Sequence, residues 1–175
     1  MLTDLSPLIA ATSQWLIRAF PPCGGALAAA LCEAQARQAV TVAAWLRYPT
    51  TADAALVGMA GPGGSARLDW ITGSDTADDS EATETAWRTW VDEVVASWAA
   101  SLLTDPELAG LAVAALADGE HLNGTPIQFR RLTGPDAGDE RAGALLRHPD
   151  LVAPVAELHR AQLVHRLGPR QPAVA

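Results

Sequence analysis

The most informative absence in this chain of 175 residues is lysine, because all twelve basic residues are arginine. A chain without lysine cannot form a side-chain Schiff base, cannot use a lysine as general base and cannot complete a nucleotide-binding P-loop. Phenylalanine and tyrosine are also scarce, with two and one residues against six tryptophans. Tryptophan therefore has to supply most of the large aromatic area of the core.

Cysteine is almost as rare, and its spacing argues against a metal site or a disulfide. Cys23 and Cys32 are nine residues apart, which places them on opposite faces if they share a helix. The four histidines include no H-x-x-x-H pair, the spacing that puts two zinc ligands on one helix face. We therefore predict buried, reduced thiols, no metal and no cofactor.

Long hydrophobic runs are missing as well. The longest, Ala26 to Cys32, is much shorter than the ~20 residues that cross a bilayer. The first residues lack the basic start of a signal peptide. The formal net charge of −8 leaves no basic face for a polyanion. These absences predict a cytoplasmic protein that binds neither membranes nor nucleic acids.

The chain contains both strand-like and helical patterns. Alternating or β-branched apolar residues predict four strands, at 39–48, 54–60, 66–72 and 127–132. Start signals and apolar periodicity predict helices at about 6–20, 25–38, 87–102, 104–119 and 140–167. Because most of the strands are grouped and do not alternate with helices, we expect an α+β fold. It would contain an antiparallel sheet of about four strands, with a central β-hairpin, packed against several helices. Residues 1–167 form one domain in this prediction and 168–175 form a flexible tail.

A glycine cluster lies at the tip of the predicted hairpin, at Gly58, Gly61, Gly63 and Gly64. Its spacing matches the first part of a P-loop, but Gly64 stands where that loop requires lysine. Dinucleotide and acyl-CoA loops open a helix, whereas residues 66–72 have the pattern of a strand. We interpret the glycines as a turn, after which Leu68 and Trp70 face the core. A phosphate site at this loop is the alternative.

The most reactive-looking segment is ADGEHLNG, at 117–124. His121 beside Glu120 has the composition of a general acid–base pair. Asp69 could join this pair if it faces a pocket. The plainer interpretation is a hydrated polar loop, since loops are normally rich in such residues.

Four further residues are candidates for a site. Arg130 and Arg131, on the last predicted strand, would clamp an anion, and Trp90, on the tryptophan-rich helix, would line a ligand pocket. Cys23 precedes a predicted helix, whose N-terminus favours a thiolate. The sequence offers no paired base for this thiol.

These candidates do not form a self-consistent catalytic set. We therefore expect a non-catalytic interaction module, such as an adaptor, accessory subunit or assembly component, with a protein partner or self-association. The acidic segment 69–93 and the small side chains of Ala26, Ala29, Ala30 and Ala34 favour such contacts. The alternative is a small-molecule enzyme or binding protein with a tryptophan-lined pocket and acid–base chemistry by His121 and Glu120.

Overall fold

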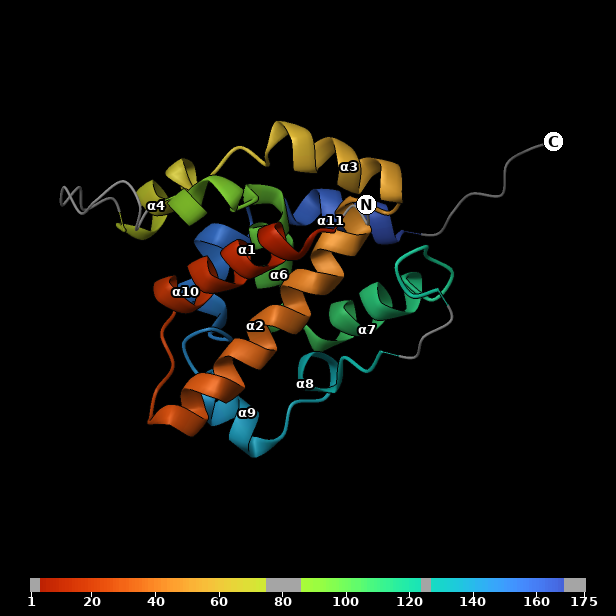
Figure 1. Ribbon diagram of the computed structural model, residues 1–175. Coiled ribbons are helices and arrows are strands. Elements are labelled where there is room, and N and C mark those ends of the chain that lie inside the picture. The colour runs from red at the N-terminus through yellow and green to blue at the C-terminus, as the bar shows by residue number, and fades with distance from the viewer. Residues whose placement is uncertain (1–3, 75–85, 124–126, 169–175) are drawn as a thin grey trace.

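The computed structural model describes residues 4–74, 86–123 and 127–168, and within these ranges it contains helices but no strand (Figure 1). The helices are α1 (Ser6–Ala19), α2 (Ala26–Arg47), α3 (Thr51–Ala60), α4 (Ala66–Thr72), η1 (Ala86–Trp90), α6 (Glu93–Thr104), α7 (Pro106–Ala115), α8 (Arg130–Thr133), α9 (Ala137–Ala142), α10 (Pro149–Ala156) and α11 (Arg160–Leu167). The expected α+β fold, with its antiparallel sheet and central β-hairpin, is therefore wrong. Of the predicted tail at 168–175, all but Gly168 lies outside the described residues.

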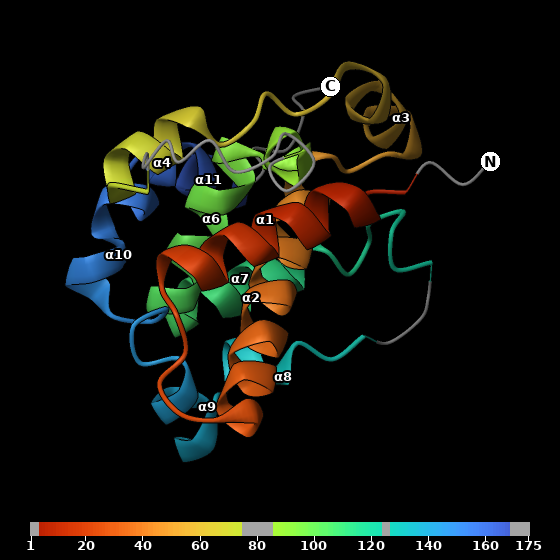
Figure 2. The same cartoon turned by 60° about the vertical axis from the view of Figure 1, so that its left-hand side comes forward.

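The long helix α2 lies at the centre of the fold. It packs against α1, α6, α7, α8 and α9, and Figures 1 and 2 show it crossing the molecule among them. The second half of α2 is enclosed on most sides, with five residues fully buried: Ala39, Val40, Val42, Ala43 and Ala44. A helix buried in this way reads as a continuous apolar run, which periodicity cannot distinguish from a strand. Most of the segment at 39–48 is therefore helix, and it was predicted as a strand because burial on most sides removed the helical period from its sequence.

Alanine allows α2 and α6 to pack closely in the core. Fully buried alanines occur on both helices, at Ala36, Ala39 and Ala43 of α2 and at Ala96, Ala99 and Ala100 of α6. The alanines expected to form a docking face lie elsewhere, since Ala26, Ala29 and Ala30 are exposed in the first turns of α2. Among the described residues, no helix is both long and apolar enough to cross a membrane.

The segment predicted as a strand at 66–72 is the short helix α4. A strand would place Leu68 and Trp70 on one face, whereas the helix buries Leu68 with Asp69 and leaves Trp70 74% exposed. The prediction that Trp70 faces the core is therefore wrong. Gly61, Gly63 and Gly64 have positive φ angles and do form a turn, but that turn connects α3 to α4.

Two of the predicted helices can be compared directly with the structure. The helix predicted at 6–20 is confirmed, because α1 has a proline in its first turn and ends just before Pro21. The single helix predicted at 87–102 is divided, because η1 ends at Trp90 and α6 begins at Glu93. Asp92 caps α6 by accepting a hydrogen bond from the amide of Val95 at 3.0 Å.

Tyr48 connects the end of α2 to the start of α6. Its hydroxyl donates to Oδ2 of Asp92 at 2.5 Å, and Asp92 is only 3% exposed. Burial, and then the hydrogen bond to this carboxylate, raise the pKa of Tyr48 to about 12.

Because Tyr48 is the only tyrosine of the chain, its ionisation can be followed alone by near-ultraviolet absorbance. We expect a midpoint near 12 in the folded protein and near the ordinary value of about 10 in denaturant. Since the folded pKa is the higher one, the stabilisation from Tyr48 is complete below pH ~10 and is lost as the pH rises through the folded value. The Asp92→Asn variant should titrate at a lower pH. A folded wild-type midpoint near 10 would contradict this assignment.

Candidate functional site

His121 is held against the C-terminal end of α2. Its Nε2 atom lies 2.6 Å from the carbonyl oxygen of Tyr48, and its ring stacks on Trp45 with 5.4 Å between centroids and 8° between planes. A carbonyl oxygen can only accept a hydrogen bond, so Nε2 carries the proton and donates it. His121 therefore caps one of the carbonyls that the end of α2 leaves unpaired.

Glu120 points to a different helix. Its Oε2 atom accepts a hydrogen bond from the backbone amide of Thr51 at 3.0 Å, at the start of α3. A carboxylate there complements the positive end of the helix dipole. Glu120 and His121 thus tie their loop to the α2–α3 junction by separate contacts, and no hydrogen bond between them is present.

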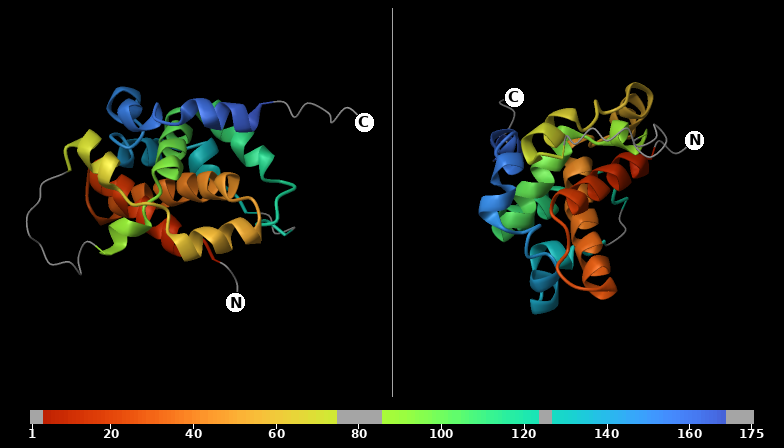
Figure 3. Two further views of the ribbon diagram at one scale, coloured as in Figure 1. Left: turned by 90° about the horizontal axis from the view of Figure 1, so that it is seen from above. Right: turned by 90° about the vertical axis from the view of Figure 1, so that its left-hand side faces the viewer.

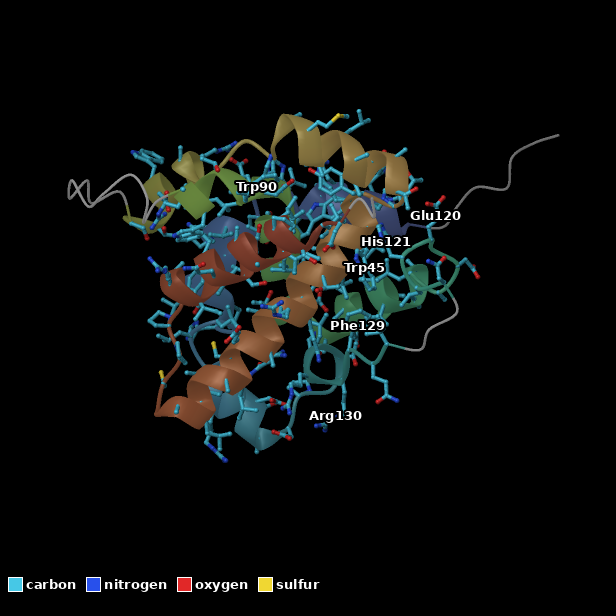
Figure 4. All side chains as sticks on the ribbon, in the orientation of Figure 1. Trp45, Trp90, Glu120, His121, Phe129 and Arg130 are labelled. Atoms are coloured by element: carbon cyan, nitrogen blue, oxygen red, sulfur yellow. The ribbon has the colours of Figure 1, made fainter. Side chains whose placement is uncertain are left out.

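The two arginines predicted to clamp an anion are not near His121. Figure 4 shows Arg130 well separated from His121 and Glu120, and its side chain is exposed. Arg131 donates from NH1 to Oδ1 of the fully buried Asp139 at 2.5 Å. The segment predicted as a strand at 127–132 contains the single turn of α8, and its arginines do not reach the predicted acid–base pair.

Asp69 is the most densely bonded of the predicted site residues. Its carboxylate accepts hydrogen bonds from Trp15 Nε1 at 2.8 Å, Ser65 Oγ at 2.6 Å and Arg88 NH1 at 2.6 Å. Asp69 is 9% exposed and joins α1, α4 and η1. Trp90 lines the same groove as Asp69, and Figure 4 places it away from His121. The structure therefore brings Asp69 and Trp90 together but separates both from His121.

The two cysteines differ in their surroundings. Cys32 is buried as predicted, whereas Cys23 is exposed in the loop before α2, so the expectation of two buried thiols is wrong. They are both free, with no disulfide between them. Desolvation raises the pKa of Cys32. Within the described ranges no hydrogen bond joins Cys23 to a base that could activate it.

A polar cluster that the sequence did not reveal lies between Gln35 and Arg147. Arg147 donates from Nε to Oε1 of Gln35 at 2.5 Å, from NH1 to the carbonyl of Leu103 at 3.1 Å and from NH2 to the carbonyl of Arg131 at 2.5 Å. Gln35 is fully buried and donates to the carbonyl of Asp139 at 2.9 Å. The sequence around Arg147, with Leu146 before it and His148 after it, gives no signal of such a role. The cluster fixes α2, α6, α8 and α9 relative to one another.

Among the residues that the structure describes, no three histidine, cysteine or acidic side chains are placed to hold a metal ion together. Comparison with protein-family models, with curated proteins and with solved structures gives no significant match.

The described surface carries an apolar region on α3. Ala54 and Val57 are the buried residues of this helix, while Leu56 is 61% and Met59 79% exposed. A groove of about 730 Å³ runs beside them, lined by the end of α3, the glycine turn, the start of α4 and η1. We call Leu56, Met59 and this groove the α3 surface. Figures 1 and 3 show α3 at the periphery of the molecule.

The glycine turn does open a helix, which removes one objection to a phosphate site there. Two other observations disfavour it. The amide of Gly64 already donates to the carbonyl of Val91 at 3.1 Å. The carboxylate of Asp69 lines the same groove and pairs with Arg88 at 2.6 Å, so a phosphate would meet a like charge and a neutralised arginine.

Proposed function

We propose that the protein is a non-catalytic interaction module of the cytoplasm, which docks a helix of a partner protein on the α3 surface. The observation that carries this proposal is the exposure of Leu56 and Met59 on one side of a surface helix. Three of the candidate catalytic residues support it indirectly, because His121, Glu120 and Asp69 each make contacts that stabilise the fold. The candidate anion-binding residue Arg131 does the same through Asp139.

The exposed side of α3 is apolar, as is typical of a surface that contacts another protein. The charged residue of this helix is Asp53, whose side chain forms a capping box with Thr50. A helix at the surface of a monomer normally turns charged and polar side chains to water. Covering a leucine or a methionine contributes about 1.5–3 kcal/mol each, so Leu56 and Met59 can act as anchors for a partner.

Charge favours a basic partner over a second copy of the chain. The protein carries a formal net charge of −8, and the carboxylates of Asp53 and Glu120 lie at the N-terminal end of α3. Two copies would repel each other, whereas an amphipathic helix with arginine or lysine beside its apolar face would be attracted. The proposed occupant is therefore an amphipathic, basic helix of another protein.

Two synthetic helices with the same leucine face, one flanked by arginine and one by glutamate, test this proposal. We expect the arginine-flanked helix to bind at physiological salt, as measured by fluorescence anisotropy. The Leu56→Gln/Met59→Gln variant should bind it at least about tenfold more weakly, because both apolar anchors are lost.

Leu111 on α7 supplies a matched control, because it is also 61% exposed. Leu111→Gln should leave the affinity unchanged. Equal weakening by the α3 and α7 substitutions, or equal affinity for the glutamate-flanked helix, would overturn the proposal. So would a dimer in sedimentation that Leu56→Gln/Met59→Gln dissociates, because the occupant would then be a second copy.

A further inference from the structure

A second cavity, separate from the α3 surface, lies where three helices end. It has a volume of about 330 Å³, and its lining comes from the C-terminal ends of α2, α7 and α11 together with the loop that carries Asp118 and His121. Trp45 and Leu46 form the α2 side, and Trp45 lies close to His121 in Figure 4. The cavity therefore brings together polar and aromatic side chains from segments that are far apart in the sequence.

The electrostatic character of the cavity is set first by the helix ends. The C-terminal end of a helix carries a partial negative charge of about −0.5, and three such ends meet here. Two carbonyls of α2 are already satisfied, since Tyr48 accepts from His121 and Leu46 accepts from Arg166 Nε at 3.3 Å. Backbone amides of the following turns satisfy carbonyls at the ends of α7 and α11 as well, so these ends contribute only their dipoles to the cavity.

Asp118 adds a full negative charge. It lines the cavity just beyond the end of α7 and makes no hydrogen bond or ion pair with any other described residue. Arg166 lines the same cavity but does not form an ion pair with Asp118. A carboxylate left unpaired beside helix C-termini favours a cation in the space before it.

We propose that this cavity binds a small organic amine, with the ammonium group at Asp118 and an apolar group against Trp45. The size supports this class of ligand, because 330 Å³ lies at the lower end of small-molecule pockets. Trp45 is half-buried, and a tryptophan wall suits both an aromatic group and a neighbouring cation. An anion would gain Arg166 but would face Asp118 and the helix ends.

Three compounds of similar shape test the proposal: 2-phenylethylamine, its neutral isostere 2-phenylethanol and the anion phenylacetate. Titrations followed by the indole N–H resonance of Trp45, assigned with Trp45→Phe, should show binding of the amine. Asp118→Asn should weaken that binding about fivefold, the upper range for an exposed ion pair. Glu107→Gln, at an exposed carboxylate in the first turn of α7, is the matched control and should leave it unchanged.

Four other results would contradict the proposed amine site. Phenylacetate binding as tightly as the amine would overturn the proposal in favour of an anion site at Arg166. If 2-phenylethanol binds as tightly as the amine, the cavity recognises only the apolar group, and this result would also overturn the proposal. An affinity that does not respond to Asp118→Asn, or a Trp45 resonance that none of the compounds shifts, would contradict it too. These results are independent of the α3 surface.

Discussion

Replacing Arg147 by methionine is expected to lower the free energy of unfolding by about 3–5 kcal/mol, since each acceptor left buried without a donor costs about 1–3 kcal/mol. Methionine fills similar volume but leaves Oε1 of Gln35 and the carbonyls of Leu103 and Arg131 without their donor. Burial lowers the pKa of Arg147, so removing the charge returns some desolvation energy. That gain offsets only part of the free energy lost with the three hydrogen bonds.

Urea unfolding followed by circular dichroism measures this effect. Arg147→Lys should be almost as destabilising, because a lysine cannot reach three acceptors in the directions that the planar guanidinium serves. Arg141→Met is the matched control, since Arg141 is exposed, and its effect should stay within about 0.5 kcal/mol. Equal effects at Arg147 and Arg141 would show that the Gln35–Arg147 cluster does not stabilise the fold.

Replacing Asp69 by alanine is the second large prediction, with an expected loss of about 2–4 kcal/mol, below the range for a fully buried ion pair because the side chain of Arg88 is partly exposed. Arg88 loses its carboxylate partner, and the indole N–H of Trp15, itself 2% exposed, loses its acceptor. Asp69→Asn retains an oxygen acceptor and should cost less. Urea unfolding gives the stability, and the indole N–H resonance of Trp15 reports the lost hydrogen bond.

Asp118→Ala provides the control for this change, because Asp118 is exposed and has no hydrogen-bond or ion-pair partner among the described residues. Its effect on stability should be within about 0.5 kcal/mol. A similar loss for Asp69→Ala and Asp118→Ala would refute the assignment of Asp69 as the residue that fixes α1, α4 and η1 together.

The parts of the fold marked by local signals were predictable. Proline at both boundaries identified α1, because proline is accepted in a first turn and excluded from a helix interior. The strands were mispredicted for a physical reason that is clearest in α2. Its segment from Ala39 to Ala44 is apolar on most sides because other helices surround it, and such burial removes the period that distinguishes helix from strand.

The candidate site was less predictable, because its chemistry depends on which residues become neighbours. His121 and Glu120 are adjacent in the sequence, but they bond to Tyr48 and Thr51, respectively. Arg147 finds its acceptor Gln35 112 positions earlier in the chain. Asp69 had no sequence signal for its burial, because the alternating pattern that suggested a strand placed it on the outer face. Side-chain pairs at such separations follow from the tertiary fold.

The most direct test of docking on the α3 surface is site-specific photocrosslinking in the cells that produce the protein. A photoreactive residue replaces either Met59, which is 79% exposed on α3, or Leu111 on α7. We predict that position 59 yields an adduct with another protein, that the crosslinked segment is amphipathic and basic, and that Leu56→Gln abolishes the adduct. Position 111 should not yield it. The same adduct from both positions, an adduct with a second copy of this chain, or none from position 59 would contradict the proposed function.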